Sequence, residues 1–199
     1  MSGWDRRRIT LLSTYERVAL DLFAAQGFRG ITVDEIADAA GISARTLFRY
    51  FPAKEDFLIG FPRRTTEALV GRIAALEPSD APLGAVWQLL RSLLLDSPPD
   101  VGLLNLWRQA ATEAPEVVDR VLGERTQALL EAVAAYCHRS LAPITSNDVR
   151  SRLMAGIVVG VELAMVEALG RSDSTLGEII EMAEHSIGLL DRAAQSSFA

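Results

Sequence analysis

The chain has 199 residues, of which 49% are hydrophobic and 23% are charged. These are the values of a globular protein, so a wholly disordered chain is excluded, and the length fits one large domain or two small ones. The single cysteine, Cys137, excludes an intrachain disulfide framework. The longest run of apolar residues and glycine, residues 153–161, is far shorter than the roughly 20 residues of a membrane span. Because the N-terminus also lacks an apolar leader, we expect a cytoplasmic protein that does not enter membranes.

The net charge of −6 is unevenly distributed along the chain. Residues 1–64 have ten basic and eight acidic side chains, whereas residues 65–199 have ten basic and eighteen acidic ones. The first segment is therefore slightly basic and the second strongly acidic. Such an asymmetry is compatible with nucleic-acid binding by the first segment, although the net charge of the whole chain disfavours it.

Helical spacing of apolar residues dominates the sequence, and no run alternates as a strand would. Ser13 and Glu16 have the spacing of a capping box. They predict that the first helix begins near residues 10–13, after a short basic arm at residues 6–8. Gly27 is suited to end this helix.

Two short helices are predicted next. Thr32 and Glu35 form a second capping box in front of a helix at residues 33–40. Ser43 is a good N-cap for a helix at residues 44–51. The turn between these helices is short, as in a helix-turn-helix motif.

Proline and glycine breaks divide the rest of the chain into further predicted helices. The sequence thus predicts an all-α fold of about nine helices. The six later helices are expected near residues 54–76, 83–96, 101–112, 115–141, 146–169 and 174–195.

The second short helix has two different faces. Leu47, Tyr50 and Phe51 share the face that can anchor the helix to its neighbours. The opposite face has no acidic residue, which is typical of a recognition helix, because arginine can pair with guanine and small residues allow close approach to the groove floor. This outward face consists of Ala44, Arg45, Phe48 and Arg49.

Groups that can bind DNA phosphates surround this face. Thr32 and Ser43 stand at helix N-termini, where backbone N–H groups favour an anion, and Thr46, Tyr50 and Lys54 are near enough to contact the DNA backbone. Three assignments stay open. Phe48 suits a thymine methyl group or packing on the first helix. Arg49 can contact a base or a phosphate. The arginines at 6–8 suit a DNA groove or solvent.

The segments FAAQGF (23–28), TVDEIADAAGIS (32–43) and TLFRYFPAKEDFL (46–58) resemble the DNA-binding domain of TetR-family transcriptional regulators. The resemblance implies an all-α homodimer with a helix-turn-helix head, a double-stranded palindromic operator as partner, and in most members repression that a small-molecule effector relieves. It places Ala44 and Arg45 at base-reading positions. It also puts Phe48 and Arg49 where the family often has Tyr and His. The implied backbone contacts are Thr32, Ser43, Thr46, Tyr50 and Lys54.

The acidic segment, residues 65–199, gives weaker indications of its function. Small residues at four-residue spacing and apolar residues of the last helix predict a homodimer interface, through Gly156, Gly160, Ala164, Ile180 and Ile187. Aromatic and polar residues are candidates for an effector pocket, although aromatic residues at helical spacing more often belong to an ordinary core. They are Trp87, Trp107, Arg108, Tyr136 and Glu162.

We therefore expect a DNA-binding domain at residues 1–53 and an effector-binding and dimerisation domain at residues 54–199. With two histidines and one cysteine, a soft-metal site is not expected, and neither is a cofactor. No catalytic motif is present, so an enzyme is the weaker hypothesis. The alternative function is a family member without DNA binding, acting as a ligand-sequestering or protein-interaction module.

Overall fold

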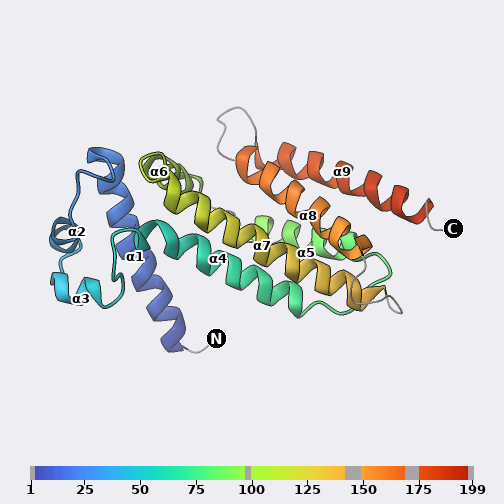
Figure 1. Cartoon of the computed structure of the whole chain (residues 1–199), viewed down its shortest axis with the longest axis horizontal. Helices are drawn as coiled ribbons and strands as arrows, with labels where there is room; N and C mark the ends of the chain where they lie inside the picture. Colours follow the sequence, from blue (N-terminus) through green and yellow to red (C-terminus); the bar gives the residue numbers. More distant parts are fainter. Residues whose placement is uncertain (1–2, 97–99, 142–148, 169–174, 197–199) are drawn as a thin grey trace. The chain divides into compact units, whose positions relative to one another are not determined.

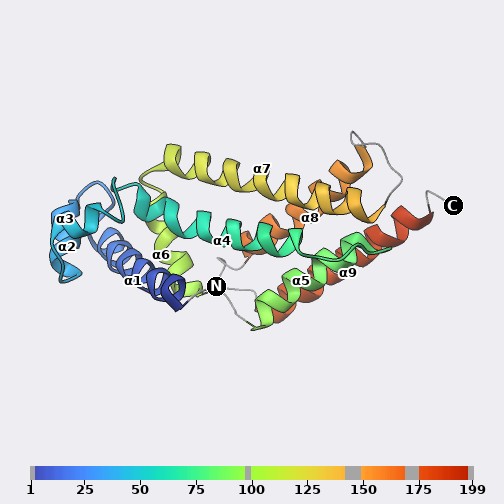
Figure 2. The ribbon, with the colours of Figure 1, turned by 90° about the horizontal axis from the view of Figure 1, so that it is seen from below.

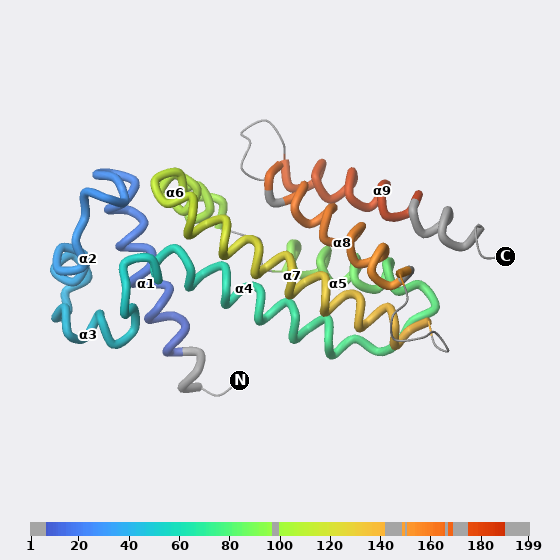
Figure 3. The backbone as a smooth tube through the Cα atoms, in the orientation of Figure 1, coloured from blue at the N-terminus to red at the C-terminus, as the bar shows by residue number. Residues whose placement is uncertain are grey.

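A computed structural model describes residues 3–96, 100–141, 149–168 and 175–196 (Figure 1), and Figure 3 follows their backbone as a smooth tube. Within these ranges the chain forms nine helices and no strand, so the predicted all-α fold is confirmed (Figure 1). The helices are α1 (Gly3–Gln26), α2 (Val33–Ala39), α3 (Ala44–Phe48), α4 (Asp56–Ala74), α5 (Pro82–Asp96), α6 (Val101–Ala111), α7 (Pro115–Ser140), α8 (Val149–Ala168) and α9 (Leu176–Ser196).

The predicted start of the first helix is wrong. Helix α1 begins at Gly3, so Ser13 lies inside it and the basic segment 6–8 is helical instead of forming an arm in front of it. Residues 4–12 contain no proline or glycine that would stop a helix, so the helix extends upstream of the apparent capping box. At the other end, Gly27 ends the helix with a φ of +82°, as expected for a residue after a helix terminus.

The described helices form two compact units. The first unit combines residues 1–65 with residues 100–125, and the second combines residues 66–99 with residues 126–199. Helices α4 and α7 contribute to both units. The functional division at residue 53 remains a prediction, because packing adds α6 and the first turns of α4 and α7 to the core of the first unit.

In the first unit, α1 packs against α6 and α2, and α2 packs against α3 (Figure 2). An aromatic cluster fills the core beneath these helices. The ring of Phe23 packs edge-on against that of Phe28 at 5.0 Å between centroids, and Phe51 stacks on Phe57 at 4.2 Å. Burial of such rings is the main source of stability of this unit.

An ion pair joins α1 to α4 in the first unit. Glu16 is 2% exposed, and its carboxylate accepts hydrogen bonds from both terminal nitrogens of the Arg64 guanidinium. Burial raises the pKa of Glu16, while the hydrogen bond and charge of Arg64 oppose that shift. Gly60 leaves the space for this pair, because a Cβ at that position would collide with the Glu16 carboxylate.

In the second unit, α5 packs against α9 and α8, and α8 packs against α9 (Figure 1). Its core is separate from that of the first unit and is mostly aliphatic, with Trp87 and Tyr136 as its largest aromatic members. No helix in the part of the chain that the structure describes is long and apolar enough to cross a membrane.

The glycines of α4 give a matched test of the Glu16–Arg64 pair. We expect Gly60→Ala to lower the free energy of unfolding by about 1–3 kcal/mol, because the added methyl group displaces a buried carboxylate. Gly71→Ala on the same helix meets no atom within 4 Å, so it should raise stability by up to about 1 kcal/mol. Urea unfolding of both variants measures the difference. Equal effects would contradict the proposed need for glycine at position 60.

Candidate nucleic-acid interface

The N-terminus of α2 is fixed by its predicted capping box. Thr32 has extended backbone geometry, and its side chain accepts a hydrogen bond from the Glu35 N–H at 3.3 Å. The Glu35 carboxylate in turn accepts from the Thr32 N–H and hydroxyl, both at 2.7 Å. These bonds lower the pKa of Glu35, the backbone N–H of Thr32 contributing most. The reciprocal pairing predicted from the sequence is confirmed.

The turn between α2 and α3 requires glycine. Gly41 has a φ of +70°, a left-handed conformation that costs other residues about 1–2 kcal/mol. Its N–H donates to the Asp38 carbonyl at 3.1 Å, and the Ile42 N–H donates to the Ala37 carbonyl at 3.0 Å. These two hydrogen bonds tie the turn back to the end of α2.

Helix α3 is shorter than the predicted 44–51, since it ends at Phe48. Its N-cap is Ser43, as predicted, and the Ser43 side chain accepts from the Thr46 N–H at 3.2 Å. The anchoring face is buried as expected: Leu47 has no exposed surface, and Phe51 is 2% exposed. These two side chains hold α3 on the core of the first unit.

The outward face of α3 is exposed and lacks acidic residues. Arg45 and Arg49 are exposed, and Phe48 keeps 44% of its surface. Ala44 is half-buried against the core. The side chain of Arg49 lies over the Tyr50 ring, 4.9 Å from its centroid, and donates to the Tyr50 hydroxyl at 3.1 Å. The structure thus holds Arg49 beside Tyr50, whereas the guanidinium of Arg45 makes no hydrogen bond or ion pair with the described part of the chain.

Lys54 has a structural position that the sequence did not indicate. Its ammonium group donates to the carbonyl oxygens of Phe28 at 2.8 Å and Ile31 at 2.9 Å, and it lies 4.6 Å from the centroid of the Phe28 ring. An ammonium group has three donors. One donor therefore remains for a phosphate, and the other two fix the loop between α1 and α2.

One side chain of α6 and one from the turn after it contact the end of α1 and the loop that follows α1. The Glu113 carboxylate, just after α6, accepts from the Arg29 N–H at 3.2 Å, and the Gln109 side chain donates to the Ala24 carbonyl at 3.0 Å. These partners lie 84 and 85 positions apart in the sequence. No local pattern could reveal them, because neither side chain is part of a motif.

The residues predicted to line an effector pocket are distributed over both units. Trp107 belongs to the core of the first unit, and its indole N–H donates to the Leu58 carbonyl at 2.8 Å. Trp87 and Tyr136 are buried in the core of the second unit. Glu162 lines a cavity there of about 10 Å³, which is about the space of one water molecule. Arg108 lies on α6, in the first unit.

The residues predicted to form a dimer interface also differ in exposure. On α8, a Cβ added at Gly156 or Gly160 would meet no atom within 4 Å, and Ala164 is exposed. Ile180 and Ile187 are buried inside the second unit, so the chain itself accounts for their apolar character. Within the described residues, no three metal-ligating side chains come together.

The geometry defines an all-helical protein with an N-terminal helix-turn-helix. Residues 17–60 match the family model of bacterial regulatory proteins of the tetR family. A segment of 49 residues is 55% identical to a protein of Mycobacterium tuberculosis assigned as the mycofactocin biosynthesis regulator MftR, and covers 25% of each chain. The transcriptional regulator RutR of Escherichia coli is 32% identical over 119 residues, which are 59% of this chain and 55% of RutR. The chain therefore spans about half the length of RutR and a quarter of MftR.

The whole fold is also similar to that of a solved structure. A crystal structure from Mesorhizobium loti, assigned to the TetR family, superposes with a TM-score of 0.58 and covers 95% of this chain and 96% of its own, at 21% identity. At that identity the likeness concerns the fold alone. The match of residues 17–60 to the tetR-family model covers the helix-turn-helix, and the solved structure shares the fold over most of the chain.

The contacts of Lys54 lead to a stability prediction. We expect Lys54→Met to lower the free energy of unfolding by about 1–3 kcal/mol, because two buried carbonyl oxygens lose their donor. Arg45→Met on the exposed face should change it by less than about 0.5 kcal/mol. Urea unfolding of the two variants provides the comparison. A destabilisation of the same size in both variants would contradict the structural role of Lys54.

The capping box gives a prediction on pH dependence. The pKa of Glu35 lies below its usual value of 4.5 in the folded chain. Its charge therefore stabilises the fold above pH 4.5, and this contribution is lost as the pH falls through the folded pKa. We expect Glu35→Gln to be less stable than the wild type at pH 7, and the two to converge as the pH falls below 4.5 and through the folded pKa of Glu35. Urea midpoints across this range test it, and a constant difference would contradict the assignment.

Proposed function

We propose that the chain is a transcriptional regulator that binds double-stranded DNA through α3, and that it works as a homodimer released from its operator by a small molecule. The observation that carries this proposal is the outward face of α3, where Arg45 and Arg49 are exposed without an acidic neighbour on a rigidly anchored helix. A solvated helix face would normally mix charges of both signs. RutR and MftR, with which the chain shares its N-terminal residues, are also named as regulators.

The geometry favours different roles for the two arginines. The side chain of Arg45 is free to reach a guanine edge in the major groove. Arg49 is held by the hydroxyl and ring of Tyr50, which suits a phosphate contact that fixes the register of the helix. The third donor of Lys54 and the hydroxyl of Thr46 would add further phosphate contacts.

A homodimer would present two such heads to a palindromic site. The exposed stripe of Gly156, Gly160 and Ala164 on α8, with Leu153 at 64% and Leu163 at 40% exposure, offers an apolar face for a second copy. Half-sites one DNA turn apart would require the two recognition helices to lie about 34–36 Å apart.

The response to a small molecule would be a shift between conformations. Helices α4 and α7 contribute residues to both units, so a ligand that binds one conformation of the second unit better can change the position of α3 through them. Its effect on operator affinity would equal its differential affinity for the two conformations. Binding of the operator and of the ligand would then be mutually antagonistic.

The first experiment is the selection of genomic DNA fragments by the purified protein. We expect the wild type to enrich a palindromic site and an Arg45→Ala/Arg49→Ala double variant to enrich none. Circular dichroism of the double variant provides the control for folding. If the wild type enriches no fragment even at low salt, the DNA-binding proposal fails, and a role as a ligand-sequestering module is favoured instead.

The base-reading role of Arg45 can be tested on the selected site. We expect Arg45→Ala to weaken binding by about 1–3 kcal/mol and to relax the preference at one base step. Arg120→Ala, an exposed arginine on α7, should leave both unchanged. Fluorescence anisotropy with the site and its single-base variants measures this. An equal loss of specific and non-specific affinity would show that Arg45 contacts phosphate.

A further inference from the structure

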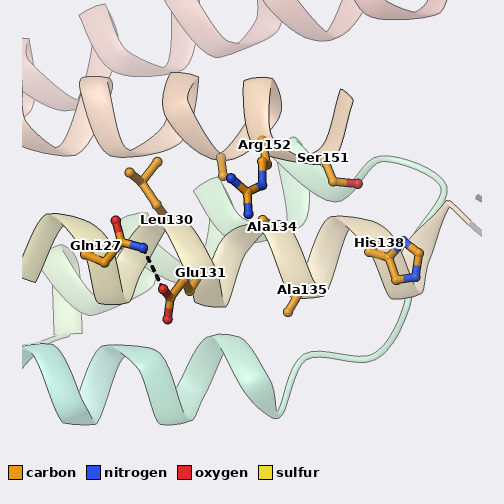
Figure 4. A pocket seen from close by; sticks show the side chains of 9 residues that line it. Gln127, Leu130, Glu131, Ala134, Ala135, His138, Ser151 and Arg152 are labelled. Carbon is orange, nitrogen blue, oxygen red and sulfur yellow. Dashed lines mark hydrogen bonds between the residues drawn. The ribbon is translucent and has the colours of Figure 1, made fainter. Parts of the chain in front are cut away.

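A groove runs between α7 and α8 on the surface of the second unit, away from the core residues that the sequence indicated as an effector pocket. Its volume is about 460 Å³, within the range of small-molecule sites. Figure 4 shows α7 along one side of the groove and the first turns of α8 along the other. The groove extends along α7 from Gln127 to His138, a distance of about 16 Å at the rise of an α-helix.

One end of the groove is rich in hydrogen-bond donors. Ser151 is among the residues that line the groove and is 4% exposed, and its hydroxyl is buried beneath the groove surface without a hydrogen-bond partner. The neighbouring Arg152 is exposed, and among the described residues its guanidinium makes no ion pair. His138 of α7 lines the same end. A buried hydroxyl without a partner costs free energy, so its position here favours a ligand that supplies the missing acceptor.

The position on α8 adds to this preference for an anion. Ser151 and Arg152 lie in the first turn of a helix of 20 residues, where the backbone N–H groups and the helix dipole favour negative charge. The hydroxyl, the guanidinium and the helix terminus therefore attract the same kind of ligand group.

The rest of the groove is lined by small apolar side chains and ends in a negative charge. Its floor is formed by the small side chains of Ala134, Ala135 and Ala155 together with Leu130. At the far end, the Gln127 side chain donates to the Glu131 carboxylate at 2.6 Å (Figure 4). The negative charge of Glu131 would repel an anion there, which sets the direction in which an anionic ligand can lie.

We propose that this groove binds an elongated small molecule with one carboxylate, which Arg152 and Ser151 hold while the apolar chain of the ligand lies on the alanines of α7 and α8. Arg152 supplies paired donors and a full charge, and a carboxylate matches that geometry. Binding can be measured without DNA, so the site does not depend on the proposed function. Only the role of the groove as the effector site of a regulator rests on the proposed function.

The test uses the full chain and three probes that share one chain length but differ in head group: octanoate, octanol and octylamine. Isothermal titration calorimetry measures each affinity, and thermal unfolding gives a second readout. We expect octanoate to bind at least about tenfold more tightly than octanol, because the charge-assisted bonds are made only by the carboxylate. Octylamine should bind more weakly than octanoate, because Arg152 repels its ammonium group and the exposed Glu131 at the far end is the acceptor left for it.

Variants of the groove locate the site. Arg152→Gln should weaken octanoate binding by about tenfold or more, and Ser151→Ala by about threefold to tenfold. Neither should change the affinity for octanol, since the alcohol does not need the donor end. Arg72→Gln removes an exposed arginine of α4 in the same unit and serves as the matched control. Ala135→Leu, at an exposed position of the groove, should weaken all three probes by filling the floor.

Several results would overturn the proposal. Equal affinity for the three head groups, or no measurable binding of octanoate, would show that the groove does not select a carboxylate. Unchanged octanoate affinity in Arg152→Gln would place any binding elsewhere. If Arg152→Gln weakens self-association in analytical ultracentrifugation but leaves octanoate affinity unchanged, the groove belongs to an interface with a second copy. If the wild type binds no DNA, the proposed function fails, but the carboxylate site in the groove is not contradicted.

Discussion

The burial of Leu47 and Phe51 is the interaction on which the proposed DNA-binding surface depends. Helix α3 has only five residues, and an isolated helix of that length is not stable in water. Its position is fixed by these two side chains, by the Ser43 cap and by the left-handed Gly41 in front of it. Only because this inner face is anchored can the outer face consist of exposed arginines that contribute nothing to the core.

The sequence predicted what local patterns determine. The capping box of Thr32 and Glu35, the glycine turn and the two faces of α3 depend on residues within a few positions of one another, and the structure has them where expected. The start of α1 was misjudged because a capping-box pattern inside a longer helix is indistinguishable from a true terminus. The partners of Glu16, Lys54 and Glu113 could not be predicted, because tertiary packing brings them together from distant positions.

The two units differ in the side chains and cavities that they offer to a ligand. The first offers cations on a fixed helix, whereas the core of the second is mostly aliphatic, with a cavity of about 10 Å³ beside Glu162. The aromatic residues that suggested an effector pocket in that core form part of its packing. A groove of about 460 Å³ lies between α7 and α8. It is lined in part by alanines, which carry no distinctive sequence signal.

The central claim, that Arg45 reads a base from an anchored helix, is tested most directly by removing the acceptor that it would contact. Replacing single guanines of the selected operator with 7-deazaguanine removes N7 alone. The account predicts that one such replacement weakens binding of the wild type by about tenfold but leaves Arg45→Ala unaffected, since the contact is already absent there. Equal losses in both proteins at every guanine would contradict it.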